Sequence, residues 1–260
     1  MEDITKYNII RIKDRGVLKE EDTVVIEYPF TIFLNDEEII TLLCSPNSLK
    51  ELTIGFLHSE GLIDSISDIE KIILDKEKGI AYVYSKNTNR LNKKFHGKRT
   101  ITSGCGKGTV FYNVVDSFNS KKIEDKIDIT IKQIMDLIKE FNKSSQLFLD
   151  TGGVHSCALC DINKIIIFKE DIGRHNALDK VLGKALLEDI DFKDKIILTS
   201  GRISSEILIK VAKRQIPVIV SRSAPTSLSI DIAKELNIIL IGFARGKRMN
   251  IYSNFPTLKV

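Results

Sequence analysis

The chain has 260 residues and a mass of 29.3 kDa, enough for one large domain or two modest ones. Its composition, 43% hydrophobic and 28% charged, excludes a disordered or collagen-like chain, and its net charge of +4 is too small to indicate a nucleic-acid-binding protein. No apolar run approaches the roughly 20 residues of a membrane span, and residues 1–16 lack the apolar stretch of a signal peptide. We therefore expect a cytoplasmic protein that binds neither membranes nor nucleic acid.

The first half of the chain predicts mainly β-strands. Strand-like runs occupy residues 23–34, 38–43, 69–74 and 80–84, and the last two are predicted to form a hairpin. Ser48 and Glu51 match a capping box, which predicts a helix from about residue 49 to 62 that ends near Gly61. Residues 86–99 are polar and basic and predict a surface loop. These patterns predict a smaller, β-rich N-terminal region over residues 1–125.

The second half of the chain predicts an α/β arrangement. Thr130 is the predicted cap of a helix over residues 131–142. Strand-like runs follow at residues 147–149, 157–160, 164–168, 195–199, 217–220, 238–242 and 249–252, and helices are predicted at residues 175–187, 204–214 and 227–236. Short apolar strands that alternate with helices predict a largely parallel or mixed sheet covered on both faces, here over residues 126–260. The whole chain is then of the α/β class, or α+β when its N-terminal region is included.

One of the four cysteines, Cys105, lies among glycines in the segment Thr102–Thr109. Glycine removes side-chain bulk, so such a loop can present a sulfur atom to a bulky partner. Lys107 would favour the thiolate, which is the nucleophilic form of cysteine. The segment is not a phosphate-binding P-loop, because Ile101 stands where that motif needs glycine. The alternative is a buried cysteine in a tight turn.

The other cysteines favour a structural interpretation. His155, Cys157 and Cys160 could supply three zinc ligands, but Cys157 begins an apparent strand. Side chains alternate faces along a strand, so Cys157 and Cys160 would point in opposite directions. We expect both, with Cys44, to be core residues, and we expect no metal site. His155 follows two glycines and is a candidate ligand-facing residue.

Basic residues recur where predicted strands meet the segments that follow them. Arg174 and His175, Arg202, Arg222, and the segment Phe243–Arg248 all occupy such junctions. Residues 201–260 hold ten lysines and arginines against three acidic residues. If the strands are parallel, these loops gather at one sheet edge, where arginines and helix N-termini would hold a multiply phosphorylated ligand and Phe243 could stack on a base. The alternative is a set of capped helices with a solvated basic face.

Several of these segments together resemble a known family. They are Leu57–Ile63, Ser103–Lys107, Thr151–His155, Glu170–Lys180, Ser200–Glu206 and Gly242–Arg248. In this order they resemble the formate dehydrogenase accessory sulfurtransferase family (FdhD), and the resemblance extends from about residue 20 to 255. It implies that a cysteine desulfurase passes sulfane sulfur to Cys105 as a persulfide. The sulfur then goes to the molybdenum or tungsten of a bis(molybdopterin guanine dinucleotide) cofactor, which is inserted into formate dehydrogenase.

The resemblance also implies a fold and a binding site. The C-terminal region would be a three-layer α/β/α sandwich similar to cytidine deaminase, and the protein would be a homodimer. The cofactor, a bound substrate here, would contact the family's binding stretch, which maps onto Phe243, Ala244, Arg245, Gly246, Lys247 and Arg248. His155, Arg174, His175, Arg202 and Arg222 are further candidates for lining that pocket.

The chain departs from the family at one position of the reactive loop. Many members carry Cys-Gly-x-Cys-Gly, whereas here Thr102 replaces the first cysteine and only Cys105 remains. A single persulfide carrier is still sufficient, because transfer needs one nucleophilic sulfur. Two alternatives stay open: a cofactor-binding chaperone that needs no thiol, and a zinc hydrolase of the deaminase type.

Overall fold

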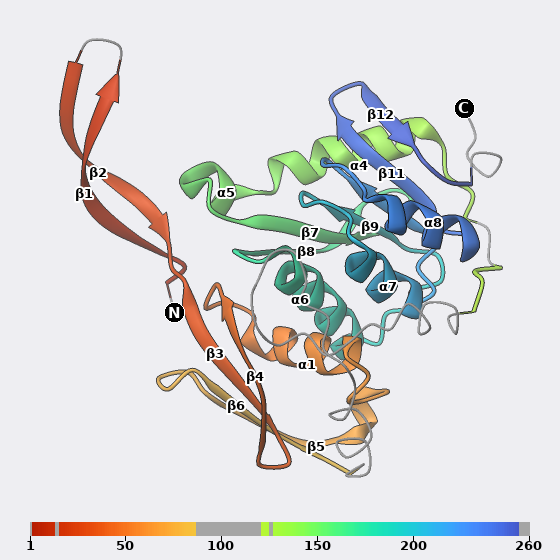
Figure 1. The fold of residues 1–260 in the computed structure, drawn as a ribbon, viewed down its shortest axis with the longest axis horizontal. Helices are drawn as coiled ribbons and strands as arrows, with labels where there is room; N and C mark the ends of the chain where they lie inside the picture. The colour runs from red at the N-terminus through yellow and green to blue at the C-terminus, as the bar shows by residue number, and fades with distance from the viewer. Residues whose placement is uncertain (1, 14–15, 87–120, 125–126, 255–260) are drawn as a thin grey trace.

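The computed structural model describes residues 2–13, 16–86, 121–124 and 127–254, and these residues form three β-sheets (Figure 1). The first sheet is a hairpin of β1 (Ile4–Lys13) and β2 (Gly16–Val25), paired antiparallel along its whole length. It projects from the rest of the molecule as a long arm. The sequence patterns predicted no strand before residue 23, so most of this arm was missed.

The second sheet has four strands in the order β4-β3-β6-β5. Its elements are β3 (Tyr28–Leu34), β4 (Glu37–Cys44), α1 (Leu49–Ser59), the 3-10 helix η1 (Ile66–Asp68), β5 (Ile69–Asp75) and β6 (Ile80–Ser85). Residues from β3, β6 and α1 form one hydrophobic core. The predicted hairpin is confirmed, since β5 and β6 pair antiparallel. The described part of residues 1–125 is thus β-rich, with a single α-helix.

Helix α1 begins differently from the prediction. Ser48 precedes the helix but has a left-handed φ of 52°, and its side chain makes no capping hydrogen bond. Its hydroxyl instead accepts a hydrogen bond from Lys169 Nζ at 2.7 Å. The predicted capping box is therefore wrong, because a contact with a distant strand uses the serine side chain. The predicted end is confirmed, as Gly61 adopts a φ of 66° just beyond the helix.

The third sheet has six strands in the order β12-β11-β10-β9-β7-β8. The elements of this region are α4 (Ile131–Lys143), α5 (Gln146–Thr151), β7 (His155–Cys160), β8 (Ile165–Asp171), α6 (Arg174–Leu187), β9 (Ile196–Thr199), α7 (Ser205–Lys213), β10 (Val218–Ser221), α8 (Ser227–Glu235), β11 (Ile239–Arg245) and β12 (Arg248–Ile251). Strands β9, β10 and β11 are parallel, whereas β7 and β12 each run antiparallel to their neighbours. The mixed sheet is thus confirmed. The strand predicted at residues 147–149 is wrong, because those residues lie in α5.

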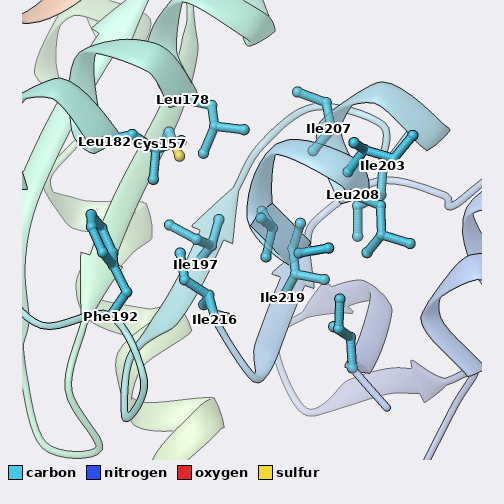
Figure 2. Packing of buried hydrophobic residues seen from close by; sticks show 14 of the residues in the cluster. Cys157, Leu178, Leu182, Phe192, Ile197, Ile203, Ile207, Leu208, Ile216 and Ile219 are labelled. Atoms are coloured by element: carbon cyan, nitrogen blue, oxygen red, sulfur yellow. The ribbon is translucent and has the colours of Figure 1, made fainter. Parts of the chain in front are cut away.

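Helices cover both faces of this sheet, so the expected three layers are present. One face packs against α6, α7 and α8 in one core cluster, and the opposite face packs against α4 in another. Cys157 belongs to the first cluster and Cys160 to the second, so the two side chains point to opposite faces as predicted. Figure 2 shows Cys157 between Leu178 and Leu182. The boundary near residue 125 and the likeness to cytidine deaminase stay predictions.

Helices α1 and α6 join the second and third sheets. They cross so closely that a Cβ atom added to Gly183 would lie 1.9 Å from the carbonyl oxygen of Glu51. On the opposite helix, a Cβ atom at Gly55 would lie 1.8 Å from the carbonyl oxygen of Asp179. Only glycine permits so close an approach of two backbones.

Candidate functional site

The strand directions bring five segments to one edge of the six-stranded sheet. The parallel strands β9, β10 and β11 all end there. Because β7 is antiparallel to β9 and to β8, its first residue, His155, lies at the same edge and opposite Asp171, the last residue of β8. The gathering of these loops is thus confirmed, and the carboxyl ends of strands are where α/β folds place their ligands.

A cavity of about 360 Å³ opens at this edge. Its lining includes Phe148, His155, Ile172, Ser200, Arg222 and Arg245. Gly152 and Gly153, between α5 and β7, form another part of its wall. The volume is within the range of small-molecule sites. The cavity therefore combines two arginines, a histidine and an aromatic ring in a space that could hold part of an anionic ligand.

His155 is held at the cavity wall by the loop after β9. Its Nδ1 lies 3.3 Å from Ser200 Oγ, and that same hydroxyl oxygen accepts a hydrogen bond from the backbone N–H of Ser156 at 2.9 Å. Burial lowers the pKa of His155 below its usual value, and the nearby charges of Arg174 and His175 lower it further. The ring is therefore neutral at neutral pH.

Arg174 and His175 begin α6 close behind this wall. The position of a Cβ atom added to Gly201 would be 2.9 Å from Arg174 Cβ and 3.5 Å from His155 Nδ1, so Gly201 lets these residues approach. His175 Nε2 lies 3.1 Å from Glu206 Oε2. Neither Arg174 nor His175 is among the residues that line the cavity. Arg202 is exposed and also lies outside that lining.

The predicted cofactor-binding stretch forms the end of β11 and a tight connection to β12. Arg245 lines the cavity, and its Nε donates a hydrogen bond to the carbonyl oxygen of Arg222 at 2.9 Å. Phe243 has a left-handed φ of 53° and is 39% exposed, while Ala244 is fully buried. Gly246, with a φ of 58°, turns the chain. Lys247 and Arg248 are exposed outside the cavity lining.

A buried polar network lies behind the loop that contributes Ile172. Asp171 and Lys180 are fully buried, and Asp171 Oδ2 lies 2.6 Å from Lys180 Nζ. The same oxygen accepts hydrogen bonds from the backbone N–H and the hydroxyl of Ser45, before α1. The other carboxylate oxygen of Asp171, Oδ1, accepts hydrogen bonds from the backbone N–H of Gly173 and from Asn176 Nδ2. The network thus fixes the cavity loop to the N-terminal region.

Sequence reasoning missed parts of this site. In the sequence, Asp171 and Lys180 were noted only as the second and last residues of the segment that begins at Glu170 and ends at Lys180, and Ser45 was not singled out. Phe148 was missed because its segment was predicted as a strand. Glu170, beside Asp171, accepts a hydrogen bond from Ser145 Oγ at 2.7 Å, which holds α5 against β8. The only signal for these contacts in the sequence was the acidic pair Glu170 and Asp171, which comes shortly after the strand predicted at residues 164–168.

The predicted reactive residue, Cys105, lies outside the described residues, as do Thr102 and Lys107. The other three cysteines are fully buried, as predicted. Burial raises the pKa of the Cys44 thiol to about 12 and raises the pKa values of Cys157 and Cys160 as well. These thiols are therefore protonated at neutral pH and shielded from solvent. Within the described part of the chain, no group of three potential metal ligands occurs.

Comparison with known proteins decides the family. A model of the FdhD/NarQ family matches residues 25–258 of the chain. The chain belongs to this family. A relative named sulfur carrier protein FdhD, from Bacillus licheniformis, is 46% identical over 98% of this chain and 97% of its own length. Another of that name, from Bacillus subtilis, is 43% identical over 95% of this chain and 94% of its own.

A solved structure extends this FdhD/NarQ assignment to the fold. The crystal structure of a putative formate dehydrogenase accessory protein from Desulfotalea psychrophila matches with a TM-score of 0.81 and 27% identity, over 99% of this chain and 100% of that one. Membership of the FdhD/NarQ family supports a sulfur-carrier role connected with formate dehydrogenase. Among the described helices, none has the length and hydropathy needed to cross a membrane.

Proposed function

We propose that the protein is a sulfur carrier for formate dehydrogenase that receives sulfur as a persulfide on Cys105. The terminal sulfur of this persulfide then passes as sulfide to the metal of a bis(molybdopterin guanine dinucleotide) cofactor, which the protein binds as a substrate. This step takes two electrons, supplied by a thiol reductant, and leaves Cys105 as a thiolate. The observation that carries the proposal is the cavity at the sheet edge, which is lined by Arg222, directly after β10, and by Arg245, at the end of the neighbouring strand β11. Guanidinium groups bind phosphate oxygens strongly, and this cofactor carries two pyrophosphates.

The loading step needs one nucleophilic sulfur and no external oxidant. The Cys105 thiolate attacks the terminal sulfur of a persulfide on the cysteine desulfurase. The sulfur–sulfur bond of the donor breaks, a new one forms on Cys105, and the donor leaves as a thiolate. The exchange needs no net oxidation or reduction, because one sulfur–sulfur bond replaces another. The step makes the protein a sulfurtransferase of the persulfide-relay type.

The other three cysteines are poor candidates for carrying sulfur. They are fully buried, and their raised pKa values keep them protonated. We therefore expect incubation with a cysteine desulfurase and cysteine to add the mass of one sulfur atom, which reductant removes, to the peptide that contains Cys105. Intact-protein and peptide mass spectrometry measure this. The Cys105→Ala variant should gain no sulfur, and equal loading of that variant would refute the assignment.

The cavity arginines should set the affinity for a guanine nucleotide. We expect Arg245→Ala and Arg222→Ala each to weaken binding of guanosine diphosphate about tenfold, because each removes a charged hydrogen-bond donor. Calorimetry at two salt concentrations measures this, with weaker binding at high salt. Lys234→Ala, on the exposed side of α8, is the matched control and should bind normally. Unchanged affinity in both arginine variants would place the ligand elsewhere.

A cofactor-binding chaperone that needs no thiol would share this cavity but would tolerate Cys105→Ala in full, so the same variant separates the two functions. The zinc hydrolase alternative loses its basis, because Cys157 and Cys160 point to opposite sides of the sheet.

The proposed partners are a cysteine desulfurase, formate dehydrogenase and a second copy of the chain in a homodimer. The exposed apolar side chains of the β1–β2 arm, Tyr7, Ile10, Ile12, Val17, Leu18 and Val24, offer a surface for such contacts.

A further inference from the structure

We infer that His155 acts as a neutral hydrogen-bond donor, with its tautomer fixed by Ser200, and that its Nε2–H recognises a phosphoryl oxygen of the ligand. The inference deepens the proposed function and rests on it, since it takes the ligand of the cavity to be a phosphorylated one. It assigns His155 a binding role and Ser200 a positioning role.

The hydrogen-bond arrangement around Ser200 selects the tautomer. Ser200 Oγ already accepts the backbone N–H of Ser156 at 2.9 Å. Its own hydrogen then needs an acceptor, and among the described residues the one within reach is His155 Nδ1 at 3.3 Å. If Nδ1 carried the proton instead, Ser200 would accept twice and its hydrogen would have no acceptor among the described residues. The satisfied arrangement places the histidine proton on Nε2.

The other ring nitrogen remains available to a ligand. Within the described part of the chain no hydrogen bond to His155 Nε2 is formed, and this atom is not among the buried polar atoms that lack a partner. It is therefore accessible on a residue that lines the cavity. Arg222 and Arg245 line the same cavity and supply its positive charge. A neutral N–H beside two guanidinium groups completes a donor set for phosphoryl oxygens.

The surrounding charges keep this donor neutral. Burial of the ring opposes a positive charge on it most, Arg174 and His175 at the start of α6 oppose it further, and the carboxylate of Asp171 favours it. Asp171 is itself occupied by Lys180, Ser45, Gly173 and Asn176. A neutral imidazole can donate from one nitrogen only, so the position of its proton determines whether it can serve the ligand.

The tautomer can be measured in the protein without ligand. The chain has four histidines, so nitrogen-15 NMR of the imidazole rings can be assigned by substitution. We expect His155 at pH 7 to be neutral and protonated on Nε2, and Ser200→Ala to give a mixture of tautomers. A protonated ring, or an Nδ1–H ring, in the unsubstituted protein would overturn the inference. This readout does not depend on sulfur transfer.

Calorimetry with inorganic pyrophosphate and, separately, with guanosine tests which part of the ligand His155 recognises. We expect His155→Ala to weaken pyrophosphate binding about tenfold, and His155→Gln, which keeps an N–H at a similar reach, to restore most of it. His58→Gln is the control, because His58 bonds the carbonyl of Asp64 outside the cavity. Three results would each overturn the inference. The first is a pyrophosphate affinity of His155→Ala equal to that of the unsubstituted protein, and the second is an effect of this substitution on guanosine binding alone. The third is no pyrophosphate binding by the unsubstituted protein. Persulfide formation on Cys105 would survive all three results.

Discussion

Gly183→Ala should destabilise the protein by more than about 3 kcal/mol, because no space exists for a methyl group where α6 crosses α1. The added Cβ would lie 1.9 Å from the backbone oxygen of Glu51, and a backbone atom cannot swing away as a flexible side chain can. Alanine favours a helix over glycine by about 1 kcal/mol, which is too little to offset this overlap. The two helices would have to separate, and with them the second and third sheets.

Urea unfolding measures this effect as a fall in the transition midpoint. Gly16→Ala is a matched control, since its added Cβ would find its nearest neighbour, the backbone oxygen of Lys13, at an ordinary 3.7 Å. We expect that control to stay within about 1 kcal/mol of the unsubstituted protein. A Gly183→Ala variant with an unchanged midpoint would show that the two helices can move apart at little cost.

The fold was most predictable from sequence where one pattern had one physical cause. Helix α4 was predicted within a residue, because Thr130 caps it in a true capping box and its apolar residues share one face. The alternation of β9, α7, β10, α8 and β11 was also predicted, since short apolar strands between helices indicate a covered sheet. The β1–β2 arm was missed because none of its residues is buried, so its strands lack the clear apolar alternation of a strand with one face in a core.

The site was predictable only in part. The arginines after β10 and in β11 were found, because basic residues at the ends of parallel strands must meet at one edge. The contribution of α5 was not, since the apolar run Leu147–Leu149 is equally compatible with a strand and with one short helical turn. The link from Asp171 to Ser45 joins residues 126 positions apart, and no local pattern signals such a contact.

The buried pair of Asp171 and Lys180 carries the second large expected effect. Both side chains are fully buried, and Lys180 Nζ also donates to the carbonyl oxygen and hydroxyl of Ser45 and to Asn47 Oδ1. Lys180→Met would leave the carboxylate of Asp171 buried without a counter-charge. Loss of one member of a buried ion pair costs about 3–5 kcal/mol, so we expect a large fall in the free energy of unfolding.

A double variant separates the lost counter-charge from lost packing. Asp171→Asn combined with Lys180→Met removes both charges, while the asparagine oxygen can still accept from Gly173 or Ser45. We expect the double variant to be more stable than Lys180→Met alone, a coupling that urea unfolding of the two single variants and the double variant measures directly. Strictly additive losses would mean that the ion pair adds nothing beyond its packing. Because the pair holds the cavity loop against the N-terminal region, the double variant should also shift the NMR signals of His155.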